Sequence, residues 1–145
     1  MTAELMYSIS NWLAICGWLG LIFGWRVRWI PQFVTGAVLP LLFALLYGIL
    51  LAGHWGAGQG SFNTLAGVRA LFSNDWLLLA GWVHYLAFDL FIGSWQVRDA
   101  RRHGIPHLAV IPGLVLTLFF GPVGLLLYFA IRVLRVRTLQ VDDAS

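Results

Sequence analysis

The chain has 145 residues, of which 60% are hydrophobic and only 10% are charged, with a formal net charge of +3. In soluble domains roughly a quarter of all residues are charged. A soluble chain of this length could not bury so much apolar surface, so an ordinary soluble protein is excluded. All nine basic residues are arginines spread between apolar runs, which excludes the compact basic face of a nucleic-acid-binding protein.

Four apolar stretches are each long enough to cross a bilayer, which requires about 20 residues of helix. We expect membrane-spanning helices at about residues 7–25, 32–52, 75–97 and 108–134. With their short connections these helices fill nearly the whole chain. Residues 1–145 are therefore expected to form a single all-α integral membrane domain, a bundle of about four transmembrane helices.

The connection between the second and third spans predicts a further short helix. Its first part, HWGAGQGSFN, is rich in glycine and predicts a turn, whereas TLAGVRALF predicts one or two helical turns lying at the membrane interface. Arg69 in this helix is expected to extend to lipid headgroups, or alternatively to hold an anionic group. Asn74 and Asp75 then provide a capped start for the third span.

Proline and glycine mark irregularities in two of the predicted spans. Pro40 lies inside the second span and is expected to bend it, because proline removes one helical hydrogen bond. Gly121, Pro122 and Gly124 lie inside the last span and predict a kink with close helix contact. With four spans, the arginines divide five to four between the two sides, so their distribution does not set the orientation.

His84 and Asp89 lie near the middle of the third predicted span. At a rise of about 1.5 Å per residue both fall inside the hydrocarbon layer, where an ionisable residue by default marks a functional site. Tyr85 is four residues before Asp89 and can hydrogen-bond to it. His84 is about 140° from Asp89 around the helix axis, so the two would meet only in a cavity shared with neighbouring helices.

This pair of side chains suits acid–base chemistry on an apolar molecule. Desolvation favours the protonated carboxyl, which can donate a proton, and a neutral imidazole can accept one. Structural roles are the alternative: Asp89 would bond to Tyr85 or to a backbone group freed at Pro40 or Pro122, and His84 would donate to a carbonyl.

Metal sites are weakly indicated. His103 and His107 have the HxxxH spacing of membrane di-iron oxygenases, but Gly104 and Pro106 intervene, and further histidine clusters are lacking. A haem held between helices would need two intramembrane histidines. We therefore expect no metal and no cofactor. Asp99, among neighbouring arginines, predicts a solvated loop, with binding of lipid headgroups as the alternative.

The third span and its flanks resemble a known family. The run LAGVRALFSNDWLLLAGWVHYLAFDLFIGSWQVRDARRHGIP, followed by LTLFFGPVGLLLY, is similar to the abscisic-acid-deficient-four-like family over about Leu65 to Tyr128. The matching elements are Gly67, Phe72-Ser73, Trp82-x-His84, Asp89-Leu90-Phe91, Asp99 and Pro122-x-Gly124. The plant members are linked to neoxanthin synthesis. Without their plastid-targeting extension, the chain looks like a bacterial member, which implies the inner (cytoplasmic) membrane.

The resemblance implies a membrane protein that acts on, or beside, carotenoids. In plants the associated conversion turns the epoxide violaxanthin into the allenic alcohol neoxanthin, an isomerisation that needs an acid and a base but no redox cofactor. We assign Asp89 as the acid and His84 as the base. The residues expected to contact the substrate are Trp82, Tyr85, Arg69, Asp99, Trp95 and Pro122.

Three functions follow as hypotheses. The first is a cofactor-free isomerase of a carotenoid or other polyisoprenoid. The second is a non-enzymatic protein that binds a carotenoid or lipid, or assists membrane assembly. The third, a small transporter or proton pathway, would need a homo-oligomer to supply the internal repeat that many transporters have. Membrane lipids are expected partners in every case.

Overall fold

The computed structural model describes residues 2–56 and 60–137. This part of the chain is entirely helical, without strands, which confirms the expected all-α class. The helical elements are α1 (Ala3–Phe23), the π-helical η1 (Ile30–Val38), α2 (Leu39–His54), α3 (Leu65–Leu71), α4 (Asp75–Arg102), α5 (His107–Phe120) and α6 (Pro122–Val136).

Three helices are long and apolar enough to cross a membrane. They are α1 with 21 residues, the continuous helix Ile30–His54 with 25, and α4 with 28. They correspond to the first three predicted spans, with ends that differ by at most five residues. The predicted start of α4 is also confirmed, since the Asn74 side chain accepts hydrogen bonds from the amides of Trp76 and Leu77. The short helix α3 lies where the sequence indicated one.

The second span begins with widened, π-helical turns. Pro40 is the second residue of α2 and has no amide proton for the helical ladder, and η1 ends two residues before it. The Thr35 hydroxyl donates to the carbonyl of Ile30 at 3.1 Å. Arg98 of α4 donates to the carbonyl of Pro31. Side chains of this helix and of α4 thus supply hydrogen bonds that supplement the irregular backbone ladder.

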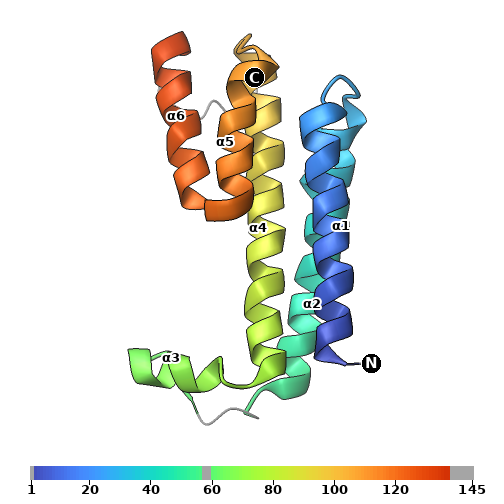
Figure 1. Ribbon diagram of the computed structural model, residues 1–145, viewed down its shortest axis with the longest axis vertical. Helices are drawn as coiled ribbons and strands as arrows, with labels where there is room; N and C mark the ends of the chain where they lie inside the picture. The colour runs from blue at the N-terminus through green and yellow to red at the C-terminus, as the bar shows by residue number, and fades with distance from the viewer. Residues whose placement is uncertain (1, 57–59, 138–145) are drawn as a thin grey trace.

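The prediction of a single fourth span at residues 108–134 is wrong. Instead of one helix, α5 and α6 form an antiparallel hairpin (Figure 1). The 14 residues of α5 extend about 21 Å, less than the roughly 30 Å hydrocarbon core. Gly121 reverses the chain with φ 42° and ψ −97°, and Pro122 starts the new helix. The expected kink is therefore a complete reversal.

The hairpin closes on itself through Gly124. A Cβ at this position would lie 2.1 Å from the backbone nitrogen of Thr117, so only glycine allows the two helices to approach this closely. The predicted close helix contact is confirmed, although it joins two helices and not two halves of one.

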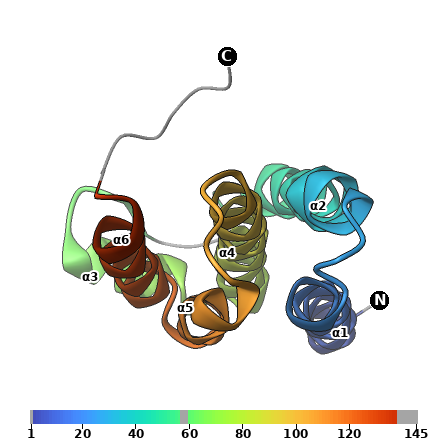
Figure 2. The same ribbon diagram turned by 90° about the horizontal axis from the view of Figure 1, so that it is seen from above.

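Helix α4 lies in the middle of the bundle, with α1 and α2 on one side and the α5–α6 hairpin on the other (Figure 2). Leu21, Val83, Leu90 and Leu114 are completely buried along these contacts. Large apolar side chains elsewhere point outward, such as Phe23, which is 76% exposed. This pattern is typical of helices that face lipid, because a soluble protein rarely exposes so much contiguous apolar surface.

Candidate functional site

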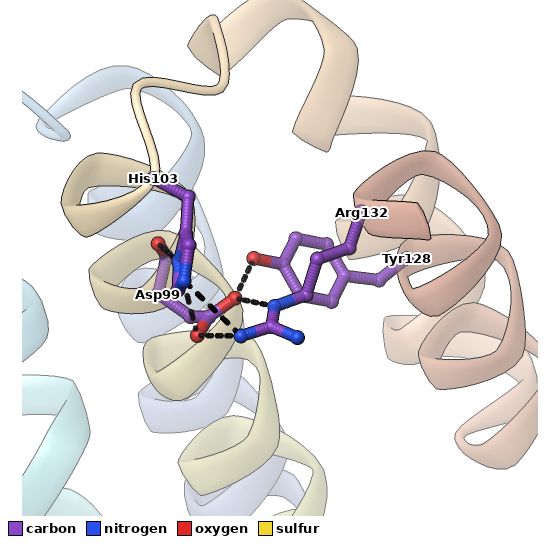
Figure 3. A network of polar contacts seen from close by, with 4 residues as sticks. All are labelled: Asp99, His103, Tyr128 and Arg132. Carbon is purple, nitrogen blue, oxygen red and sulfur yellow. Dashed lines mark hydrogen bonds and ion pairs between the residues drawn. The ribbon is translucent and has the colours of Figure 1, made fainter. Parts of the chain in front are cut away.

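A buried ion pair joins α4 to α6 (Figure 3). Asp99 is 4% exposed, and its partners Tyr128 and Arg132 are completely buried one turn apart on α6. The Arg132 Nε donates to Asp99 Oδ2 at 2.8 Å, and the Tyr128 hydroxyl donates to the same oxygen. Asp99 is therefore not in a solvated loop as the sequence predicted, because α4 continues to Arg102.

His103 completes this network. Its Nδ1 is 2.9 Å from the Asp99 carbonyl and its Nε2 is 3.2 Å from Arg132 Nη2. A carbonyl only accepts and a guanidinium only donates, so Nδ1 carries the proton and Nε2 accepts. The opposite charges of Asp99 and Arg132 are therefore paired directly, with His103 packed beside them. With its hydrogen bonds paired in this way, the network suits holding the hairpin against α4 better than chemistry.

Asp89 lies against the turn of the hairpin. Its carboxyl is beside the Tyr85 hydroxyl, which donates to the carbonyl of Leu118 at 2.8 Å. The two carboxyl oxygens would lie 3.0 and 3.2 Å from a Cβ at Gly121. Within the described residues, the buried Asp89 Oδ2 has no hydrogen-bond partner. Tyr85 and Asp89 thus both lie at the end of α5, but the Tyr85 hydroxyl donates to Leu118 and not to Asp89.

His84 lies on a different side of α4. It is exposed, and its ring packs 5.3 Å from Tyr47 and 4.7 Å from Phe88, measured between ring centroids. It lines a cavity of about 570 Å³ between α2, the chain before α3, the end of α3 and α4. Asp89 is not part of this lining. The structure therefore does not bring His84 and Asp89 together.

Aromatic, apolar and small polar side chains make up the cavity beside His84. Those that define it are Tyr47, Trp55, Ser61, Phe62, Asn63 and Phe72. Tyr47 and His84 are the groups in the lining that can transfer a proton. Because the rest is largely apolar, the arrangement suits an apolar ligand that carries an oxygen near the imidazole.

The remaining predicted site residues are scattered. Trp82 donates through Nε1 to Asn11 at 2.8 Å and lines a separate cavity of about 680 Å³ between α1 and α4. Trp95 packs edge-on against Tyr128, 5.4 Å between ring centroids. Arg69 is exposed on α3, and Pro122 is exposed at the start of α6. None of these four lines the cavity beside His84.

The histidines with HxxxH spacing diverge. His103 belongs to the Asp99 network, whereas His107 lies 3.0 Å from the Ile22 carbonyl and stacks on Trp25. In residues 2–56 and 60–137, no group of three or more His, Cys, Asp or Glu side chains is arranged to hold a metal ion.

The sequence profile of the ABA DEFICIENT 4-like family matches residues 5–128. The chain belongs to this ABA4-like family. Comparison with curated proteins and with solved structures gives no match. Membership supports the coarser expectation, a carotenoid-related membrane protein, and extends the resemblance to the first two spans.

Tyr128 and Arg132 of this ABA4-like protein were not among the site residues predicted from the sequence. Arg132 lies four residues beyond the family match, but inside the span predicted at 108–134. Like His84 and Asp89, Arg132 is an ionisable residue inside a predicted span, which by default marks a functional site. Its spacing of four from Tyr128 placed both on one helix face. Gln96 was also not among the expected site residues; it is completely buried on α4, and its amide donates to the buried Thr117 hydroxyl at 3.0 Å.

Proposed function

We propose that this ABA4-like protein binds a carotenoid or related polyisoprenoid in the cavity beside His84 and isomerises it without a cofactor. The cavity carries the proposal. Its volume of about 570 Å³ lies within the range of roughly 300 to 1,000 Å³ typical of small-molecule sites. Its aromatic walls suit a polyene, and they lie between helices that lipid-soluble molecules reach from the bilayer.

The geometry favours Tyr47 over Asp89 as the acid. Tyr47 and His84 both line the cavity, with their rings in contact at 5.3 Å between centroids, whereas Asp89 lies at the hairpin turn. In the opening of an epoxide to an allenic alcohol, His84 takes a proton from the carbon chain. The carbon–oxygen bond breaks, and the Tyr47 hydroxyl donates to the oxygen. Proton transfer from His84 to Tyr47 then restores both residues, so no electron or atom is gained.

Replacing His84 by alanine is expected to abolish conversion, because the base is removed while no buried hydrogen bond is lost. Loss of a general base costs typically 10²- to 10⁴-fold in rate. The measurement is the pigment profile of carotenoid-producing bacteria, supplied with epoxide xanthophylls, that express each variant. His54→Gln serves as the matched control, because His54 stacks on Trp76 outside this cavity.

Two further variants show whether Tyr47 or Asp89 is the general acid. Tyr47→Phe should stop formation of the product, whereas Asp89→Asn should still form it. The opposite outcome would return the acid role to Asp89, and unchanged pigments in His84→Ala would contradict catalysis on the supplied substrates.

Binding without chemistry is the second candidate function. Its support is that the aromatic lining alone is sufficient to hold a polyene. Purification in a mild detergent distinguishes the two. A coloured pigment that copurifies unchanged, with the same identity in wild type and His84→Ala, supports the binding function.

A further inference from the structure

The cavity beside His84 is elongated along the bundle axis. Its wall on the α2 side is the stripe Tyr47, Leu51 and Trp55, and its wall on α4 is the stripe Leu77, Gly81 and His84. Residues three or four positions apart share one face of a helix, so each stripe runs along the helix axis. At about 1.5 Å per residue the stripes extend about 10 to 12 Å. The cavity therefore suits a narrow ligand that lies parallel to the helices.

The two ends of this cavity lie at different depths. His84 is nine residues after Asp75, the first residue of α4, so it lies about 13 Å along the helix from that end. Trp55 directly follows α2, and Asn63 lies just before α3. The end of α2, the start of α3 and the start of α4 all lie at the same end of the bundle (Figure 1). One end of the cavity is therefore in the hydrocarbon layer, and the other is at the membrane interface.

Polar groups line the interfacial end without a partner in the protein. Within the part of the chain that the structure describes, neither the Trp55 indole nor the Asn63 amide hydrogen-bonds to another residue. Both residues are exposed, so a ligand can replace water there. An amide donates and accepts hydrogen bonds, and an indole donates one. A hydroxyl group, which also donates and accepts, complements both side chains.

The segment that carries Asn63 is packed closely against α3. A Cβ at Gly60 would lie 2.5 Å from the Leu71 nitrogen, and one at Gly67 would lie 2.5 Å from the Ser61 carbonyl oxygen. Only glycine lets the segment and the helix approach this closely, because all the atoms involved belong to the backbone or to a would-be Cβ. Asn63, two residues after this contact, is therefore presented to the cavity from a fixed segment.

We propose that Trp55 and Asn63 bind a hydroxyl group, so that the cavity takes a polyene whose terminal ring is hydroxylated. The ring hydroxyl lies at the interface, and the carbon chain runs past His84 toward the bilayer centre. A hydroxylated polyene adopts this orientation in a bilayer by itself, because its polar end is costly to place in hydrocarbon. The inference rests on the function proposed for this cavity and adds its specificity.

The test is competition between an epoxide of β-carotene and the same epoxide with a hydroxyl group on its epoxide-bearing ring. The purified full chain in an uncharged detergent is given both pigments, and the ratio retained is corrected for empty micelles, with any product counted as its substrate. The wild type should retain the hydroxylated pigment in about threefold to tenfold excess, as one or two hydrogen bonds predict. Asn63→Leu and Trp55→Phe should each move the ratio toward one, because they keep an apolar wall but remove the hydrogen-bonding group.

Ser73→Ala is the matched control. The Ser73 hydroxyl donates to the Ala70 carbonyl of α3 and does not line the cavity, so the ratio should stay within about twofold of the wild type. A structural role of Asn63 would lower the retention of both pigments and leave their ratio unchanged. That result would overturn the inference, as would equal retention of the two pigments by the wild type.

The same experiment separates this inference from the proposed isomerase. Conversion of both pigments without preference would support the isomerase and contradict hydroxyl recognition. A preference that depends on Asn63, without any conversion, would contradict the isomerase and support hydroxyl recognition. If the wild type retained neither pigment, both would be contradicted.

Discussion

Asp99→Asn is expected to destabilise the protein by about 3 to 5 kcal/mol. The substitution leaves the Arg132 guanidinium, which is completely buried, without the carboxylate that it contacts at 2.8 Å. Breaking a buried ion pair on one side costs this much because an uncompensated charge remains in a low-dielectric interior. Helix α6 should then loosen from α4, since the network is the polar link described between these two helices, while α5 stays joined to α4 through Gln96 and Tyr85.

The measurement is the free energy of unfolding in mixed detergent micelles, for Asp99→Asn, Arg132→Gln and the double variant. The double variant should lose less than the sum of the two single losses by about 2 kcal/mol or more, because the interaction is shared. Asp75→Asn is the control. This exposed carboxylate at the start of α4 should cost at most about 1 kcal/mol. Similar losses for Asp99→Asn and Asp75→Asn would contradict the structural role of the ion pair.

Gly124→Ala should be nearly as damaging. A Cβ at this position would lie 2.1 Å from the Thr117 nitrogen and 2.5 Å from the Gly113 carbonyl oxygen. Both are backbone atoms that cannot move aside as a side chain can. The two helices of the hairpin must separate, so we expect a loss of about 3 kcal/mol or more.

Gly48→Ala provides the comparison for Gly124→Ala in the same unfolding assay. Gly48 also lies within an apolar helix, but a Cβ there meets nothing within 4 Å. Alanine should be neutral there or should stabilise by about 0.4 to 1 kcal/mol. Equal effects of the two substitutions would show that the α5–α6 contact is looser than the structure has it.

The sequence predicts the first three spans because hydrophobic length and capping residues are local properties. Asn74 and the apolar run after it are enough to place the start of α4. The hairpin is different, since a hydrophobic run of 27 residues, 108–134, reads the same whether the chain continues or reverses. The chain reverses because Gly121 adopts φ 42° and because Gly124 packs closely against Thr117. Neither feature can be predicted from hydropathy.

The same limit applies to the site. Tyr85 and Asp89 could be paired from sequence because four residues make one helical turn. Tyr47 and His84, or Asp99 and Arg132, are 37 and 33 positions apart and meet only through packing of separate helices. The hypothesis that His84 and Asp89 converge required a neighbouring helix to bridge two faces of α4, and the structure places a different element against each face.

The reversal at Gly121 changes how charge is divided between the two ends of the molecule. The connection after α1 and the C-terminal turns of α4 and α6 all lie at one end, and α3 lies at the other (Figure 1). Eight of the nine arginines belong to the first end, and only Arg69 belongs to the second. The near balance expected from four spans thus becomes a strong asymmetry.

Such an asymmetry fixes the topology under the positive-inside rule. We expect the arginine-rich end in the cytoplasm, three crossings, and the two chain termini on opposite faces of the membrane. Fusions of a reporter pair, one active only in the cytoplasm and one only outside it, should be active at opposite ends of the chain. Activity of one reporter at both ends would mean that α5 and α6 do not form the re-entrant hairpin in the bilayer.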